Sequence, residues 1–291
     1  MGRLSIFWSS LKRSLRIMAR NKVGFFGFIM TLLIVIVAYI APLFVKPDLT
    51  AHLDLIYQKP SAAHWLGTDN QGRDIFRQIL IGGKSVISVA ALTAFCTVFL
   101  GTTLGALSGI LGGWVETITN TLAELIMTIP HFPLLLVIAA FFRLESGAGL
   151  ALIIASISWG TLMRTVRAQV LTLKERDYVQ AARALGLPTS HLLFNEILPN
   201  MMSYILVQFI MSMTGAIYYM TILVFLGITP MKQADWGVMF TLASRMGAIY
   251  NPNSQMFLFA PILAIVLLQF SLIAMTRSLD ELFNPRLRAG E

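Results

Sequence analysis

Residues 178–200 read YVQAARALGLPTSHLLFNEILPN, a polar and basic stretch of helix-forming residues between two hydrophobic runs. The stretch is too long for a simple turn between two helices. Glu175 to Leu185 favours a helix, Gly186 is well placed to end it, and Pro188 prevents its continuation. The sequence therefore predicts a short helix and a fixed turn, in a form suited to dock on another protein.

A second short helix is expected after this turn. Thr189 or Ser190 can cap it, it runs through Glu196, and Pro199 suits the entry to the following hydrophobic run. A short helix that presents apolar residues among polar neighbours can fill a groove of a partner protein, or it can rest on lipid. The apolar residues expected to be exposed on it are Leu192, Leu193 and Phe194.

The composition indicates the class of protein. The chain of 291 residues is 56% hydrophobic and 12% charged, with mean hydropathy +0.74. Soluble domains carry about 25% charged residues, so half that share in long apolar runs indicates an all-α polytopic membrane protein. The net charge of +8 does not indicate nucleic acid, because Lys and Arg cluster at the ends of the apolar runs. The single cysteine, Cys96, excludes an intrachain disulfide and a cysteine metal site.

Six apolar runs are long enough to cross a hydrocarbon core of about 30 Å as helices. The third run begins with several polar residues, and the fourth has an alternative end near Leu162, before Arg164. The expected spans are 24–44, 86–111, 117–142, 149–171, 202–227 and 256–276.

Most of the 22 Lys and Arg residues lie in the N-terminal arm, in residues 164–200 and in the C-terminal tail. With six spans these regions share one side, and the positive-inside rule places them and both termini in the cytoplasm. The arm over 1–22 is predicted to be an amphipathic helix on the anionic leaflet, rather than a cleaved signal peptide or a disordered tail. The remaining predicted parts are one membrane domain over 23–291, external loops over 45–85 and 228–255, and a cytoplasmic loop over 172–200.

The third span contains Pro130 and Pro133, which remove backbone donors and should break or bend the helix. A bend of this kind is useful where spans rock against one another. Glu124 in the same span is a functional candidate, because an ionisable group inside a membrane is costly. Its alternative role is structural, as the partner of Arg164 or Arg167.

Glycines recur every four residues in the second span, which places them on one helix face and lets another backbone approach closely. The favoured interpretation is tight packing against a helix of this chain or of a partner, and the alternative is a pore-lining face. The glycines are Gly101, Gly105, Gly109 and Gly113.

Motifs for catalysis or nucleotide binding are weak. The GKS sequence at 83–85 lacks the earlier glycine of a phosphate loop, since Gln78 stands there. His64, Asp69 and Asp74 match no calcium or zinc spacing and are expected to form a folded external turn. No hydrolase or zinc-protease pattern is visible. We therefore expect no catalytic residue, metal or cofactor on this chain.

Several motifs resemble the permease subunits of ABC importers. Residues 178–200 resemble the cytoplasmic loop that carries the coupling helix in that family, although Gln180 stands where Glu is usual. HWLGTDNQGRD over 64–74 is similar to the external signature of the second permease subunit of dipeptide, oligopeptide and nickel importers. Further similar segments are 159–186, Trp236-Gly237 and NPRLR over 284–288.

The resemblance implies two sets of functional residues. Those implied to couple the chain to an ATPase are Gln180, Ala181, Ala182, Gly186, Leu187, Pro188, Leu192, Phe194, Leu198 and Pro199. The external motif consists of Gly67, Thr68, Asp69, Gly72, Arg73 and Asp74.

The resemblance also implies the type I ABC importer permease fold. The implied partners are a second, non-identical permease, two ABC ATPase subunits that bind ATP and Mg, and an external binding protein, in the cytoplasmic membrane of a bacterium or archaeon. The implied cargo is a short peptide, with nickel complexes and oligosaccharides as alternatives. A stand-alone secondary transporter or channel is the alternative from another class, and it predicts transport without ATPases and charged residues at the bilayer midplane.

Overall fold

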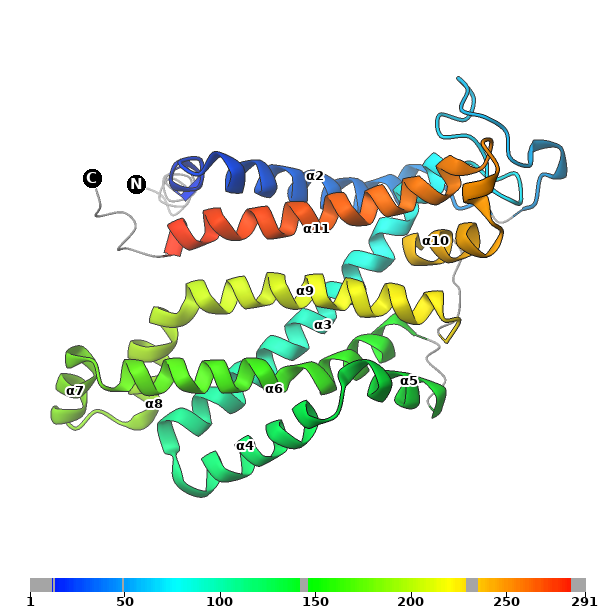
Figure 1. The fold of residues 1–291 in the computed structure, drawn as a ribbon. Helices are drawn as coiled ribbons and strands as arrows, with labels where there is room; N and C mark the ends of the chain where they lie inside the picture. The colour runs from blue at the N-terminus through cyan, green and yellow to red at the C-terminus, as the bar shows by residue number, and fades with distance from the viewer. Residues whose placement is uncertain (1–11, 13, 49, 142–145, 229–234, 284–291) are drawn as a thin grey trace.

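The computed structural model describes residues 12, 14–48, 50–141, 146–228 and 235–283, and these are mostly helical (Figure 1). Within them, the only β contact is an isolated bridge between Thr68 and Asp74. The predicted all-α class is therefore confirmed. The longer helices are α2 (Lys22–Phe44), α3 (Ile75–Leu111), α4 (Gly113–Thr128), α5 (His131–Phe141), α6 (Gly147–Lys174), α9 (Met202–Phe225), α10 (Trp236–Arg245) and α11 (Gln255–Phe283). The shorter ones are η1 (Leu53–Leu55), α7 (Asp177–Ala184), α8 (Thr189–His191), η2 (Leu192–Ile197), η3 (Leu198–Met201) and η4 (Ala248–Tyr250).

Five helical stretches are long and apolar enough to cross a membrane: α2, α3, α6, α11 and Thr189–Phe225, which contains α9. The sixth candidate is the pair α4–α5, which bends by 86°. The break falls where the extended backbone of Ile129 ends α4 and Pro130 has no N–H to continue it. If the pair α4–α5 is counted as one span, the structure has the six predicted candidate spans in its described residues. The predicted bend is also confirmed.

Helix boundaries at two connections differ from the prediction. Helix α3 begins at Ile75, earlier than expected, because the side chain of Asp74 accepts a hydrogen bond from the N–H of Arg77 and caps the helix. The loop predicted over 45–85 therefore ends at Asp74. Helix α6 does not end near Leu162 but continues to Lys174. The loop predicted over 228–255 contains the helix α10.

Helix α3 is central to the fold and contacts most of the other long helices. It runs obliquely across them in Figure 1 and packs most extensively on α6. Gly101, Gly105 and Gly109 lie in that contact. A Cβ on Gly105 would lie 2.5 Å from the carbonyl oxygen of Met163 and 2.8 Å from the Cβ of Val166. The predicted tight packing is confirmed for these three glycines, and the neighbour is a helix of this chain.

Gly113 does not belong to this contact, so its assignment to the packing face was wrong. It begins α4 with φ +58°, and no atom lies within 4 Å of a Cβ placed on it. Together with Gly112 at φ +66° it turns the chain from α3 into α4. The four-residue spacing places glycines on one face only while the helix continues, and α3 ends at Leu111.

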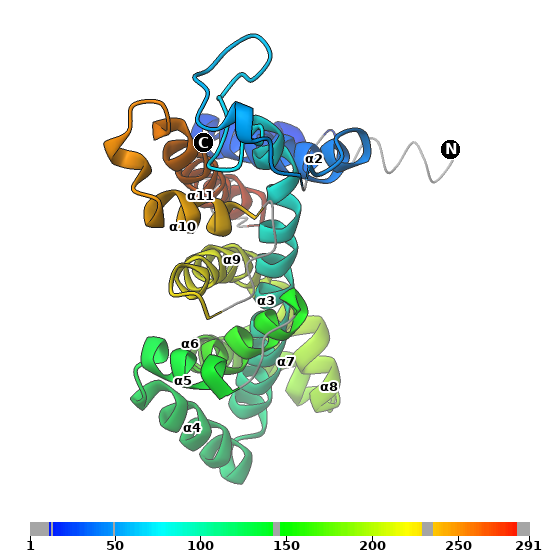
Figure 2. The same ribbon diagram turned by 90° about the vertical axis from the view of Figure 1, so that its right-hand side faces the viewer.

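The helix ends form two groups. Helices α7 and α8 lie at the same end as the start of α2 and the end of α11, whereas α10 and the loop before α3 lie at the opposite end (Figure 1). Seen from that opposite end, α9 lies between α6 and the layer of α10 and α11 (Figure 2). The main apolar core lies where α3, α6, α9 and α11 meet. The predicted arm over 1–22 and the motif over 284–288 fall largely or wholly outside the described residues.

Candidate functional site

Residues 177–201, which we call the tip segment, contain the predicted turn after α7. Gly186 has φ +73°, a conformation that residues with a Cβ rarely adopt. Its N–H donates to the carbonyl of Arg183 at 2.9 Å, and the N–H of Leu187 donates to the carbonyl of Ala182 at 3.3 Å. These two bonds form a Schellman motif, which satisfies carbonyls at the helix end and holds the turn in one conformation. The predicted helix stop at Gly186 is confirmed.

The second helix of the tip segment starts and ends differently from the prediction. Neither Thr189 nor Ser190 caps it: Pro188 precedes its first turn, and no side chain bonds the free N–H groups there. The chain then continues through the π turn η2 and the 3₁₀ turn η3 into α9 without a break. The tip segment therefore ends in a helical rod that is continuous with a membrane span.

The change of helix type near Pro199 has a local cause. Proline has no N–H to donate to the carbonyl four residues earlier, which is that of Asn195. The N–H of Leu198 reaches back to the carbonyl of Leu193, and the side-chain amide of Asn200 donates to the carbonyl of Glu196 at 2.7 Å. The helix passes the proline by changing its hydrogen-bond register rather than by stopping.

The base of the tip segment is an apolar cluster. Leu192 and Leu193 are buried, so the exposure predicted for them was wrong. They pack with Val170 at the end of α6 and with Val179 and Ala182 of α7. Because α7 folds back on η2, both helices bury their apolar faces against α6. Leu192 and Ala182 are therefore part of the internal packing that supports the segment.

The tip segment also presents apolar side chains to the surface. We call its exposed apolar residues, Leu185, Leu187 and Phe194, the apex. Leu185 is 80% exposed, Phe194 is 64% exposed and Leu187 is 36% exposed. Sequence reasoning missed Leu185, although its place directly before a helix-ending glycine was a usable signal. Of the other predicted coupling residues, Ala181, Gly186, Pro188 and Pro199 are exposed and Leu198 is half-buried.

Gln180 turns toward the chain itself. Its side-chain amide donates to the carbonyl of Lys174, the last residue of α6, at 2.9 Å, and it lies 3.3 Å from a carboxylate oxygen of Glu175. The amide therefore closes the corner between α6 and α7. A carboxylate at this position could not donate either bond.

Two ion pairs join α4 to α6. Arg164 pairs with Glu124 at 2.5 Å, as the structural alternative for Glu124 predicted. Arg167 pairs with Glu116, which the sequence reasoning did not single out. Because α4 is the first half of the bent span, these ion pairs hold the bent span against α6.

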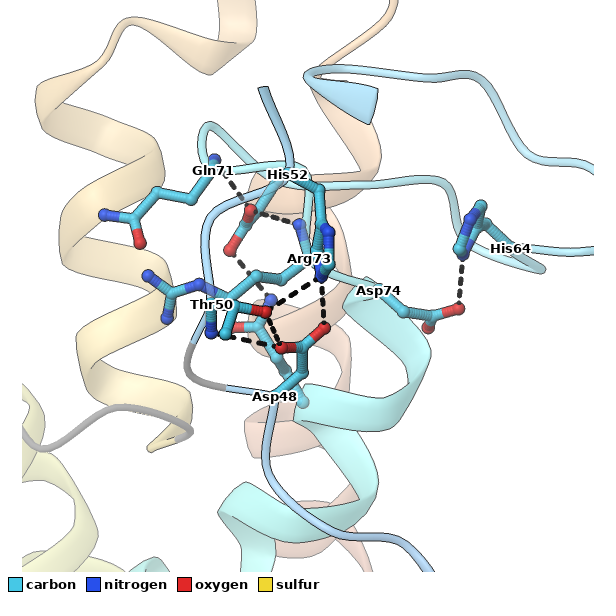
Figure 3. Close-up of polar contacts among 9 residues, drawn as sticks. Asp48, Thr50, His52, His64, Gln71, Arg73 and Asp74 are labelled. Carbon is cyan, nitrogen blue, oxygen red and sulfur yellow. Dashed lines mark hydrogen bonds and ion pairs between the residues drawn. The ribbon is translucent and has the colours of Figure 1, made fainter. Parts of the chain in front are cut away.

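The external motif is a folded turn, as predicted, and Figure 3 shows its Gln71, Arg73 and Asp74. Asp69 makes the central hydrogen bonds of this turn. The buried carboxylate of Asp69 accepts hydrogen bonds from the N–H groups of Gln71 and Arg73 at 2.8 and 2.9 Å, and from the side-chain amide of Gln78 in α3 at 2.8 Å. Thr68 is fully buried and bonds the carbonyl of Leu55. The motif thus anchors the loop to the first turns of α3.

The two glycines of the motif make the turn possible. Gly67 has φ +76° and Gly72 has φ +74°. A Cβ on Gly72 would clash with the carbonyl oxygen of His52. The two segments of the loop therefore approach each other so closely that glycine is required there.

Histidine and aspartate side chains pair within the same loop. His64 bonds Asp74 at 2.8 Å while Asp74 also caps α3, and His52 bonds Asp48 at 2.9 Å (Figure 3). Hydrogen bonds from Thr50 and His52 lower the pKa of Asp48 from 3.8 to about 2. Across the described residues, no group of three His, Cys, Asp or Glu side chains is arranged to hold a metal ion. The acids of this loop serve its hydrogen bonding.

Two protein-family models match this chain. Residues 101–289 match the family model described as binding-protein-dependent transport system inner membrane component, and residues 9–60 match that of the N-terminal transmembrane domain of oligopeptide transport permease C. The chain is 33% identical over 271 residues to the oligopeptide transport system permease protein OppC of Bacillus subtilis, covering 92% of this chain and 87% of that protein.

Two further relatives carry related names. The chain is 30% identical to the dipeptide transport system permease protein DppC of Bacillus subtilis, over 94% of this chain and 85% of that protein. It is 31% identical to the glutathione transport system permease protein GsiD of Pectobacterium atrosepticum, over 93% and 89% respectively. The resemblance to ABC importer permeases is thereby confirmed. The chain belongs to the family of binding-protein-dependent transport system inner membrane components, and it is a multi-pass transport subunit rather than an enzyme.

Proposed function

We propose that this chain is a permease subunit of an ATP-driven importer and forms a path for short peptides together with a second, non-identical permease. The proposal draws its cargo from the relatives, which are named for oligopeptide, dipeptide and glutathione transport and align over nearly the whole chain. Two ABC ATPase subunits bind ATP and Mg in this assembly. An extracellular or periplasmic binding protein delivers the peptide.

The tip segment carries the proposal, because its geometry suits the transfer of force from an ATPase. Its apex exposes Leu185, Leu187 and Phe194, which can enter a partner's groove. Its base is packed against α6, and its second helix continues into α9. A push on the apex is therefore transmitted to two spans at once. ATP binding must favour one of two arrangements of these spans over the other.

The orientation is proposed from charge. Arg183 lies in the tip segment and Arg176 directly precedes it, while Arg20 and Lys22 lie at the start of α2, at the same end of the molecule (Figure 1). The positive-inside rule places this end, with both termini, in the cytoplasm of a bacterium or archaeon. The opposite end, with α10 and the external motif, then faces the binding protein.

Co-expression with a candidate second permease, two ATPases and a binding protein tests the proposal. The tagged chain is purified in mild detergent, reconstituted in vesicles, and assayed for ATP-dependent uptake of radiolabelled trialanine. We expect a complex with both ATPases and uptake that requires the binding protein. Uptake of a nickel complex or an oligosaccharide instead would contradict the peptide cargo. Transport by the chain without ATPases would favour the stand-alone transporter or channel.

A further inference from the structure

A cavity of about 510 Å³ lies between α3, α5, α6 and α9 and is partly open to the surface. Its lining residues on α9 include Tyr204, Gln208, Ser212 and Tyr219, which recur at the three- and four-residue spacing of a single helix face. On α6 the cavity is lined near the middle of the helix, around Ser158. The cavity is therefore at the depth of the membrane interior and not at either end of the molecule.

The lining is uncharged and combines polar with apolar side chains. The described residues around the cavity include no Asp, Glu, Lys or Arg, whereas they include hydroxyl groups, the amide of Gln208 and the imidazole of His131. Polar groups inside a membrane are costly unless they face protein or water. The hydroxyls of Thr93, Ser158 and Thr165 donate to carbonyls of their own helices, and a polar occupant can complete the lining groups that remain.

Several of these side chains have unused hydrogen-bonding capacity. Thr97 is 3% exposed, lines the cavity, and its hydroxyl has no partner among the described residues. Gln208, Ser212 and Thr161 also line the cavity, and the structure shows no side-chain hydrogen bond for them in the described part of the chain. An unpaired buried hydroxyl costs about 1–3 kcal/mol, so a ligand or water that bonds the hydroxyl of Thr97 would remove this cost.

The break in the third span opens onto the same cavity. His131, the first residue of α5 after the 86° bend, is one of the lining residues. Pro130 leaves the carbonyl of Ile126 without its usual helical donor. Irregular backbone at membrane depth is tolerated where it lines a polar cavity, and broken helices often build transport sites.

We propose that this cavity is a transit site that binds the main chain of an extended peptide through uncharged hydrogen-bonding side chains. The inference rests on the proposed function and specifies what the path recognises. A peptide offers an N–H and a C=O at every residue whatever its side chains are, and hydroxyl and amide groups can both donate and accept. A charged lining would select among peptides by side-chain charge, whereas this lining treats them alike.

Gly215 provides a way to plug the site. It lines the cavity, and no atom lies within 4 Å of a Cβ placed on it, so a larger side chain enters open space without displacing a neighbour. Gly215→Leu is expected to reduce maximal trialanine uptake at least tenfold while the complex still assembles. Gly215→Ala is expected to keep at least half of the uptake. Thr214→Leu is the matched control, because Thr214 is the adjacent residue and does not line the cavity.

Thr97→Val separates a binding role from a packing role. If the hydroxyl only packs, its removal relieves an unsatisfied buried group, so stability rises or stays constant and uptake is unchanged. If the hydroxyl binds peptide, maximal uptake falls severalfold although the protein is at least as stable. The same split is expected for Gln208→Leu, which keeps the size of the side chain.

The outcomes distinguish the two proposals. Wild-type vesicles that take up no peptide would contradict the proposed function itself. Wild-type uptake with normal uptake by Gly215→Leu, Thr97→Val and Gln208→Leu would overturn the transit site alone. Maximal rates for tripeptides with a central Lys, Glu or Ala, measured at saturating binding protein, should agree within about threefold, because an uncharged lining gives no strong preference for either charge. A strong preference for one charge would also overturn it.

Discussion

The side-chain amide of Gln180 donates a 2.9 Å hydrogen bond to the main-chain carbonyl of Lys174, across the corner between α6 and α7. The bond closes the one turn that separates a membrane span from the tip segment. The interaction depends on a donor at this position, which a carboxylate does not provide. Gln180 therefore contributes to the stiffness of the corner and not to the exposed apex.

We predict that Gln180→Glu loosens the corner. The carboxylate cannot donate to Lys174 and is repelled by Glu175, so the local opening free energy should fall by about 0.5–1.5 kcal/mol. Hydrogen exchange followed by mass spectrometry should show faster exchange over residues 175–182. Asn195→Asp is the control, because it makes the same change in the same segment at an amide whose hydrogen-bond partner is the side chain of His191. Equal exchange in both variants would contradict the role of Gln180.

Gly186→Val should uncouple ATP hydrolysis from uptake. A β-branched residue at φ +73° is strained by about 1–2 kcal/mol, and no neighbouring atom is displaced, so the change acts on the turn alone. Gly186→Asn is the matched variant, since Asn tolerates the left-handed conformation. We expect ATPase activity without proportional uptake in the valine variant and near-normal uptake in the asparagine variant. Normal uptake by both would exclude a coupling role for this turn.

Residues at the apex and base of the tip segment should give opposite phenotypes. Phe194→Asp and Leu185→Asp change exposed side chains, so we expect loss of ATPase co-purification with an unchanged melting temperature. Leu192→Ala removes a buried side chain and should destabilise the chain by about 2–5 kcal/mol. Tyr250→Asp is the control for added charge, because Tyr250 is exposed and lies in η4, shortly after α10. ATPase binding that survives both apex changes would contradict the proposed docking.

The α3–α6 contact should not accept a methyl group. Gly105→Ala places a Cβ 2.5 Å from the backbone oxygen of Met163, and such overpacking costs about 1–3 kcal/mol. The melting temperature of the detergent-purified chain should fall. Gly215→Ala is the matched control, because it makes the same change in a helix facing open space and should leave the melting temperature unchanged or higher. Equal effects in the two variants would contradict the packing assignment.

Local features of this protein were determined by the sequence alone. Six apolar runs set the number of spans, because only a helix of about 20 apolar residues crosses a bilayer. Pro130 predicted the bend, and Gly186 predicted the helix stop, because each acts through its own backbone chemistry. The glycine spacing predicted a close helix contact for Gly101, Gly105 and Gly109.

The tertiary structure alone decided which surfaces face what. Leu192 and Phe194 are both apolar and lie in the same short helix, yet the first is buried under α7 and the second is exposed. In a membrane protein an apolar side chain can face lipid, another helix or a partner, so hydrophobicity does not say which. The cavity likewise depends on side chains from four separate helices. Packing between segments that are distant in the chain brings these side chains together. A local sequence pattern therefore cannot predict the cavity.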